Sequence, residues 1–132
     1  MPPADRPAAR ARPVYLDLPR IRLPVPGIVS ILHRISGVLL FLVGIPLLLA
    51  GVAMSLASPE SFAQLRGNFA HPLAKLVLLV LVWSYIHHFC AGIRFLLLDV
   101  HKGIELEAAR RTSVVVLVVS LALTAVAGAR LW

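Results

Sequence analysis

The stretch that decides the fold is VLLFLVGIPLLLAGVAMSL, residues Val38–Leu56, which contains no ionisable side chain. A helix that crosses a membrane needs about 20 predominantly apolar residues, so this stretch is long enough to be one. Its apolar character extends back to about Ile28, and two more apolar segments follow at about residues 73–98 and 113–131. The sequence therefore predicts an all-helical membrane protein with three transmembrane helices, the first at about 28–56.

The composition agrees with this interpretation. Of the 132 residues, 59% are hydrophobic and 14% are charged, whereas ordinary soluble domains have about 45–50% apolar and about 25% charged residues. These values argue against a soluble globular enzyme and against a disordered chain. The single cysteine, Cys90, excludes a disulfide framework and a multi-cysteine zinc or iron–sulfur site within this chain.

Residues 1–27, which precede the first predicted span, are rich in proline and arginine. Proline cannot continue a regular helix, so we predict an extended arm here. A signal peptide is disfavoured because the apolar run begins late and exceeds an h-region of roughly 7–15 residues. The prolines also disfavour the amphipathic helix of a mitochondrial transit peptide. We therefore expect a bacterial inner membrane, with the mitochondrial inner membrane as the alternative.

Positive charge is concentrated on segments that a three-helix topology places on one side of the membrane. The net charge of the chain is +7. The connection after the first span, where Ser58-Pro59-Glu60 predicts a turn, contains few of the basic residues. The basic residues that precede or open the first span, and those that follow the second, are Arg6, Arg10, Arg12, Arg20, Arg22, Arg34, Lys102, Arg110 and Arg111. By the positive-inside rule the N-terminus is cytoplasmic and the C-terminus periplasmic. No nucleic-acid partner is needed to explain the charge, because no basic face is interleaved with aromatic residues.

Small residues recur every seven positions in the first span, at Ser30, Gly37, Gly44 and Gly51. On a helix with 3.6 residues per turn such a stripe drifts by only ~20° per repeat. Small residues on one stripe let helices approach closely in lipid, so we interpret the glycines as a packing face. Pro46, inside the same span, predicts a kink.

An ionisable side chain at membrane depth marks a candidate functional site, and the second span contains His88. It lies ~15 Å from the end of the predicted span, at 1.5 Å per helical residue. Ala91 and Gly92 follow on the same helical face and leave space beside the imidazole for a large, flat group. Two interpretations stay open, a hydrogen bond to a neighbouring helix and ligation of a haem whose second ligand comes from another chain. His87, which points about 100° away, is the local competitor.

Ser30, His33 and Arg34 share a face at the cytoplasmic end of the first span, because they are spaced i, i+3 and i+4. One interpretation is that Arg34 simply extends its charged end to the membrane interface. The other is that the hydroxyl, imidazole and guanidinium together bind a polar head group. A quinone carbonyl or a haem propionate would suit them, since a guanidinium pairs well with a carboxylate.

Three motifs occur in a characteristic order: RPVYLDL at Arg12–Leu18, SILHRISG at Ser30–Gly37 and HxxxGIR at His88–Arg94, followed by Asp99. With them the sequence closely resembles the cytochrome b membrane-anchor subunit of succinate dehydrogenase, or complex II, of the proteobacterial type. The resemblance covers about residues 12–132 and includes the layout of three spans. The second and third motifs together are fairly specific to this family.

The resemblance implies roles for individual residues. His88 would be one axial ligand of haem b, and the other would come from a second, smaller anchor subunit that completes a larger helix bundle. Ser30 and Arg34 match residues that line the ubiquinone site, and His33 and Arg34 match residues near the haem propionates. The chain would dock an iron–sulfur subunit and a flavoprotein subunit on the cytoplasmic face. Succinate would be oxidised in the flavoprotein, and this chain would pass electrons from the iron–sulfur subunit to ubiquinone.

One position departs from the family pattern. Related sequences often have histidine directly after the GIR triplet, whereas this chain has Phe95. Phenylalanine cannot donate a hydrogen bond, so a propionate contact from this position is lost. Two other functions stay open: the anchor of a fumarate reductase, working in the opposite direction, and a haem-free anchoring protein. A small transporter is disfavoured because the first and third predicted spans contain no acidic residue.

Overall fold

The fold is that of a computed structural model, which describes residues 21–132. Most of the predicted N-terminal arm, with the RPVYLDL motif, lies outside the described residues. Within them every regular element is helical, as the sequence predicts. In chain order the elements are α1 (Val25–Leu39), the π-helical turn η1 (Leu40–Gly44), α2 (Ile45–Ala57), α3 (Pro59–Ala70), α4 (Pro72–Asp99) and α5 (Leu106–Leu131).

Three helical segments are long and apolar enough to cross a membrane, so the predicted number of spans is confirmed. The first, Val25–Ala57, runs through α1, η1 and α2, and the others are α4 and α5. The main difference in boundaries is at α5, which begins at Leu106 and not at residue 113. Its first turns are polar, and Glu107 and Arg111 form an exposed ion pair of 2.6 Å across one turn. A polar helical turn has no apolar signature, which is why the sequence pattern missed it.

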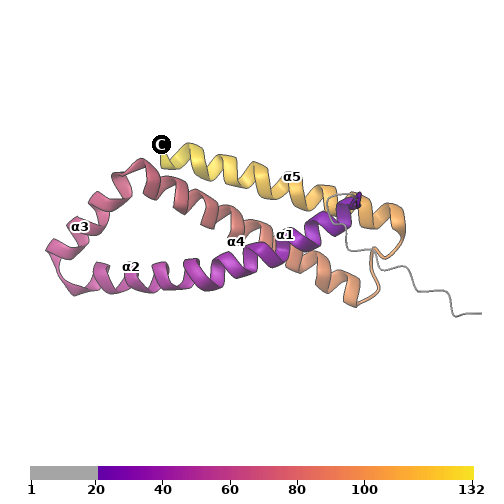
Figure 1. The fold of residues 1–132 in the computed structure, drawn as a ribbon, viewed down its shortest axis with the longest axis horizontal. Helices are drawn as coiled ribbons and strands as arrows, with labels where there is room; N and C mark the ends of the chain where they lie inside the picture. Colours follow the sequence, from indigo (N-terminus) through magenta and orange to yellow (C-terminus); the bar gives the residue numbers. More distant parts are fainter. Residues whose placement is uncertain (1–20) are drawn as a thin grey trace, which may run out of the picture.

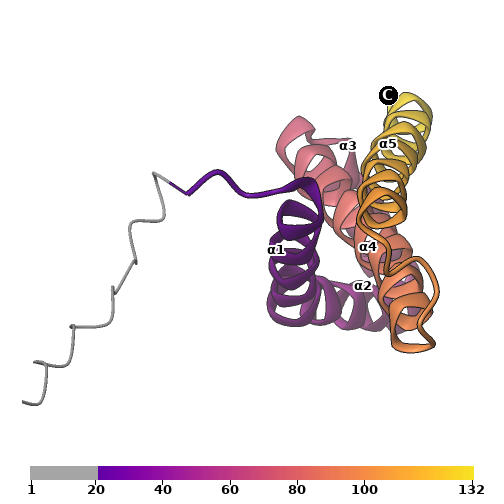
Figure 2. The same cartoon turned by 90° about the vertical axis from the view of Figure 1, so that its right-hand side faces the viewer.

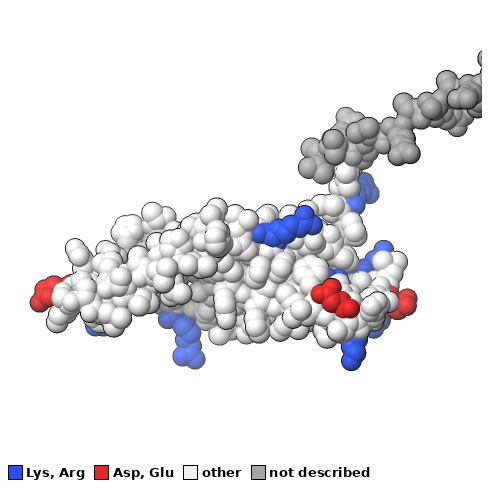
Figure 3. Space-filling model, turned by 90° about the horizontal axis from the view of Figure 1, so that it is seen from below, with Lys and Arg blue, Asp and Glu red and all other residues white. Residues whose placement is uncertain are grey.

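Helix α4 packs against both α1 and α5 (Figures 1 and 2). The start of α1 and the α4–α5 connection lie at one end of the molecule, whereas α3 and the C-terminus lie at the other (Figure 1). This is the arrangement that a three-span topology requires. On the face shown in Figure 3, charged side chains gather mainly at the right-hand end, and isolated basic side chains interrupt the otherwise uncharged surface between the two ends.

Small residues fill the contacts between these helices. Val29, Ala91 and Val116, from α1, α4 and α5, form the buried apolar core. The buried hydroxyl residues around this core are Ser36, Ser84, Ser113, Ser120 and Thr124. Such hydroxyls can donate to a carbonyl of their own helix, as Ser84 does to Val80 at 2.8 Å. Small side chains allow the helix backbones to approach closely, which is what stabilises helix association in lipid.

The first span changes its helical geometry at η1, directly before Pro46. Proline lacks a backbone N–H, and its ring clashes with the carbonyl four residues earlier in an α-helix. In η1 the N–H of Ile45 bonds to the carbonyl of Leu40, five residues earlier, which is the π-helical pattern. Beyond η1, α2 diverges from α4, and α3 leads back to the start of α4 (Figure 1). The irregularity expected at Pro46 is thus a π-helical turn.

The connection between the first two spans is itself helical, whereas the sequence predicts a turn at Ser58-Pro59-Glu60. Helix α3 begins with a capping box, in which Ser58 and Ser61 exchange hydrogen bonds between side chain and backbone, each of 3.1 Å. Pro59 takes a position in the first turn, where its missing N–H would be unpaired anyway. Glu60, in the same first turn, is exposed. Its carboxylate accepts hydrogen bonds from the Glu60 backbone amide and from the Ser58 hydroxyl, and these lower its pKa. The residues interpreted as a turn are therefore the start of a helix.

Helix α4 ends in a Schellman motif. The N–H of Lys102 bonds to the carbonyl of Leu97, and that of His101 to the carbonyl of Leu98, both at 2.9 Å. The motif places His101 in the left-handed region, with φ of 60°. Glycine occupies this region without steric cost, whereas a residue with a Cβ does not.

We predict that His101→Gly stabilises the chain by about 0.5–1 kcal/mol, because the relief of left-handed strain exceeds the greater backbone entropy of glycine. Thermal unfolding of the detergent-solubilised protein measures the effect. Lys102→Gly is the matched control: Lys102 has no positive φ, so glycine there should lower the unfolding midpoint. A His101→Gly midpoint at or below that of the wild type would contradict the strain argument.

Candidate functional site

The imidazole of His88, on α4, faces the backbone of α1. Its Nδ1 lies 3.0 Å from the carbonyl oxygen of His33 and 3.3 Å from Oγ of Ser36. A carbonyl oxygen can only accept a hydrogen bond, so Nδ1 of His88 must carry the proton. In a neutral imidazole the lone pair is then on Nε2, which is left free to bind another group.

Gly37 makes this close approach possible. A Cβ built on Gly37 would lie 2.9 Å from Cε1 of His88, closer than a real Cβ atom comes to its neighbours. The glycine stripe of the first span is therefore not one uniform packing face. Gly37 makes room for an imidazole, Gly44 packs near Leu81 of α4, and Gly51 has nothing within 4 Å in the described chain.

The side chain of His33 lies against the His88 ring. The two imidazoles are stacked, with centroids 4.0 Å apart and planes 9° from parallel. Phe95 meets the His33 ring edge-on at 5.1 Å, and a Cβ on Gly92 would lie 3.9 Å from Nε2 of His33. His88, Gly92 and Phe95 therefore share one face of α4, and the space predicted beside the His88 imidazole contains the ring of His33.

Ser30 and Arg34 contact each other on α1, one turn apart. An Nη atom of Arg34 donates to Oγ of Ser30 at 3.1 Å, and Arg34 is otherwise exposed. The guanidinium has five N–H donors, so this one bond leaves donors for a ligand. The structure brings Ser30 and Arg34 together as predicted, whereas His33, on the neighbouring part of the helix surface, turns toward α4.

His87 occupies a different environment from its neighbour. Its side chain is completely buried, its ring stacks on Trp83 at 5.3 Å, and Nδ1 lies 3.3 Å from Oγ of Ser120 on α5. Its Nε2 is buried without a hydrogen-bond partner among residues 21–132. A large group could reach His87 only if the contact between α4 and α5 opened, so the geometry favours His88 as the ligand.

Arg94 of the HxxxGIR motif links α4 to α5. Its Nε donates to Oγ1 of Thr112 at 3.1 Å, and an Nη donates to the carbonyl of Ala109 at 3.4 Å. The side chain is 5% exposed, and its guanidinium lies 5.5 Å from the centre of the Phe95 ring. The HxxxGIR motif alone predicts no role for Arg94, and the structure shows that its side chain connects α4 to α5 by hydrogen bonds.

Among residues 21–132, the metal-binding side chains near His88 are too few for a metal ion held by this chain alone, but they fit a cofactor that takes a single ligand from this chain. In the described part of the chain, no cluster of three or more histidine, cysteine, aspartate or glutamate residues can hold a metal ion. A zinc centre made by one protein chain needs three or four such ligands. A haem whose ligands are shared between two chains needs only one from this chain, and Nε2 of His88 is a candidate for it.

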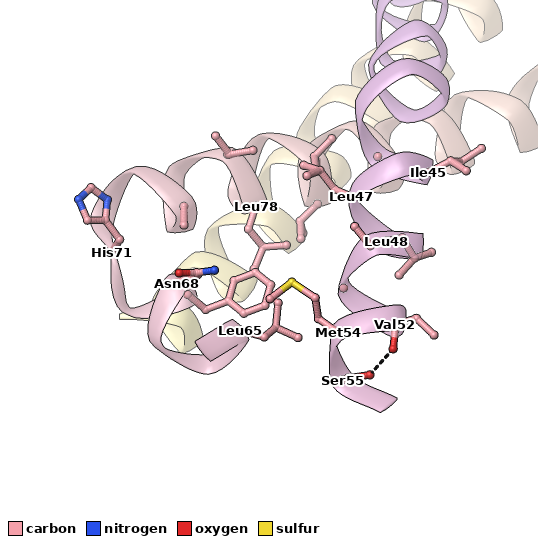
Figure 4. A pocket seen from close by; sticks show the side chains of 18 of the residues that line it. Ile45, Leu47, Leu48, Val52, Met54, Ser55, Leu65, Asn68, His71 and Leu78 are labelled. Atoms are coloured by element: carbon pink, nitrogen blue, oxygen red, sulfur yellow. Dashed lines mark hydrogen bonds between the residues drawn. The ribbon is translucent and has the colours of Figure 1, made fainter. Parts of the chain in front are cut away.

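A large apolar groove lies elsewhere, between α2, α3 and the first half of α4. Its volume is about 1240 Å³, and Met54 and Leu65 face one another across it (Figure 4). The few polar side chains along it include Asn68 and His71. None of the residues predicted for haem or quinone binding lines this groove, so it is separate from the site around His88.

Comparison with known families now identifies the chain. Residues 8–127 match the model of the succinate dehydrogenase/fumarate reductase transmembrane subunit. The chain belongs to this family. The succinate dehydrogenase cytochrome b556 subunit of Coxiella burnetii is 36% identical over 122 residues, covering 92% of this chain and 97% of the relative. The proteins of the same name from Paracoccus denitrificans and Rickettsia prowazekii are each 31% identical, over 77% and 86% of this chain and 78% and 87% of their own lengths.

The resemblance inferred from the SILHRISG and HxxxGIR motifs is therefore confirmed, and the chain is a multi-pass membrane subunit of the succinate dehydrogenase type. Two residues of the SILHRISG motif lie against the His88 ring without having been predicted to do so. Ser36 received no role, and Gly37 was assigned to packing alone. Their spacing of three and four residues from His33 places them on one helix face, and this was the only signal available in the sequence.

We predict that Gly37→Ala destabilises this succinate dehydrogenase subunit by about 1–3 kcal/mol, the usual cost of overpacking, because the added methyl group displaces the His88 ring. Thermal unfolding in detergent measures the loss. Gly51→Ala is the matched control in the same span, and it should be neutral or slightly stabilising because Gly51 has open space around it. Equal unfolding midpoints for the two variants would show that Gly37 does not make room for His88.

Proposed function

We propose that this subunit binds haem b and passes electrons from the iron–sulfur subunit of succinate dehydrogenase to ubiquinone. The observation that carries the proposal is the state of His88, whose Nδ1–H is held by the His33 carbonyl at 3.0 Å. Histidines that ligate metals typically donate their other ring N–H to a carbonyl or carboxylate in this way. The name cytochrome b556 of the relatives supports a b-type haem, and their name succinate dehydrogenase supports succinate oxidation over fumarate reduction.

The residues around His88 fit such a group. His88 would be one axial ligand through Nε2, and the second, smaller anchor subunit would supply the other. The imidazole of His33 lies against His88 and is proposed to hold one propionate. The exposed guanidinium of Arg34, on the same turn of α1, is proposed to hold a propionate from another side. Phe95 contacts His33 only through its ring and has no hydrogen-bond donor, so in this proposal only His33 and Arg34 bind the propionates. Haem b, when bound, supplies a one-electron centre whose potential its protein surroundings adjust.

Ser30 and Arg34 are proposed to bind ubiquinone. Their hydrogen bond of 3.1 Å holds the guanidinium near the hydroxyl, so both can donate to one quinone oxygen. Reduction places negative charge on that oxygen, and prearranged donors stabilise such charge more than they stabilise the neutral carbonyl. The exposure of Arg34 leaves the guanidinium open to a ligand from outside the three-helix unit.

We further propose that the end bearing Ser30 and Arg34 faces the cytoplasm, in a bacterial inner membrane. The iron–sulfur and flavoprotein subunits would dock there, so that electrons enter close to the quinone residues. The second anchor subunit would cover part of the exposed apolar surface, which includes Phe41, Leu48 and Phe89. Membrane lipid would cover the rest, and the two anchors together would form one larger helix bundle.

We predict that His88→Ala removes the b-type haem signal from the assembled complex, because the iron loses its ligand from this chain. A dithionite-reduced minus oxidised spectrum measures the signal. His71→Ala, an exposed histidine at the other end of α4, is the control and should retain it. An intact wild-type complex without the signal would indicate a haem-free anchor, and a signal unchanged in His88→Ala would move the ligand elsewhere.

We predict that Arg34→Ala lowers kcat/KM for quinone by about 10–100-fold, which corresponds to the loss of one charged hydrogen bond of about 1.5–3 kcal/mol. Quinone reduction by the purified complex measures this, and succinate oxidation with an artificial acceptor should be unaffected. Arg110→Ala removes an exposed arginine from α5 and serves as the control. Unchanged turnover and unchanged apparent quinone affinity in Arg34→Ala would rule out the proposed quinone role.

A further inference from the structure

The hydroxyl of Ser36 lies where α1 meets the ring of His88. Ser36 is completely buried, and its Oγ is 2.9 Å from the carbonyl oxygen of His33 and 3.3 Å from Nδ1 of His88. Three polar groups from two helices therefore meet in one small contact. Their protons can be assigned from what each group is able to donate.

The assignment starts from the carbonyl. The His33 oxygen only accepts, so it takes the hydroxyl proton of Ser36 and also the Nδ1 proton of His88. Having donated its proton, the Ser36 oxygen still has lone pairs, one of which faces the same Nδ1–H. The single N–H of His88 is thus shared between two acceptors, and each donor in the contact has a partner.

We propose that Ser36 is a positioning residue for the iron ligand: with the His33 carbonyl it holds the Nδ1–H of His88 and so fixes the tautomer, the plane and the basicity of the ring. This inference rests on the proposed haem ligation by His88. Two acceptors on Nδ1–H increase the electron density at Nε2, and a more basic ligand favours ferric over ferrous iron. Ser36 acts only through His88 and does not touch the iron or the quinone.

A simpler role for Ser36 must be separated from this one. Serines in transmembrane helices often donate to a carbonyl of their own helix, as Ser55 does to Val52 at 2.8 Å. Ser55 lies in the same span as Ser36 but shares no hydrogen bond with a ring. If Ser36 did no more than this, its loss would affect stability but leave the electronic properties of the haem unchanged.

The experiment compares Ser36→Ala with the matched control Ser55→Ala in the purified, assembled complex. In Ser36→Ala we expect the haem midpoint potential to move to more positive values and the low-spin ferric EPR signal to shift. We also expect haem affinity to fall about 10-fold, the lower end of the effect of losing a hydrogen-bond partner behind a metal ligand. Ser55→Ala should match the wild type in all three measurements, and Ser36→Thr, which keeps the hydroxyl, should restore the potential.

The outcomes separate this inference from the proposed function. A wild-type complex without haem would overturn both. Haem that is lost in His88→Ala but has the same potential and EPR signal in Ser36→Ala as in the wild type would overturn the role of Ser36 alone. If Ser36→Ala assembles poorly, Ser36→Cys is the second variant, because cysteine has a similar volume and a weaker hydrogen-bond acceptor. The haem midpoint potential of Ser36→Cys must then lie between two values: that of the wild type and that of the Ser36→Ala molecules that still bind haem.

Discussion

The structure depends on one interhelical contact, in which the carbonyl of His33 on α1 accepts the Nδ1–H of His88 on α4. The Nδ1–H of His88 cannot be left unpaired at membrane depth, because no water is present to replace the partner. The contact requires the two helices to approach so closely that a side chain at Gly37 would collide with the imidazole. The register of α1 against α4, the orientation of His88 and the need for glycine at position 37 therefore have a single cause.

Helix α4 lies between α1 and α5, and two adjacent histidines of α4 each contact one of these neighbours. Neighbouring residues of an α-helix point about 100° apart, so His88 meets α1 while His87 meets Ser120 of α5. Arg94 adds a second tie to α5 nearer the end of the helix. Because α5 holds α4 on one side, the ring of His88 is fixed against α1 on the other and cannot rotate away.

The sequence predicted what composition and periodicity can encode. Long apolar runs specified the spans, and the i, i+3, i+4 spacing placed Ser30 beside Arg34 on one helix. It missed α3 and the polar start of α5, because short polar helices have no apolar signature. The small residues beside His88 and the HxxxGIR motif favoured His88 over His87, but the sequence could not show that His87 packs against α5 or that Gly37 faces an imidazole, because both depend on which helix lies opposite. A glycine pattern looks the same whether a backbone or a ring fills the space beside it.

The π-helical turn at Leu40–Gly44 divides the first span into two parts with different tasks. All the candidate residues of this span, from Ser30 to Gly37, lie in α1, where the helix is held against α4. Beyond the turn, α2 diverges and borders the apolar groove, which none of the predicted haem or quinone residues lines. A redox site needs its ligands fixed to within a fraction of an ångström, whereas an apolar membrane surface needs only to stay apolar. By placing Pro46 and the turn beyond Gly37, the sequence confines the irregular geometry to the part of the span where no ligand has to be positioned.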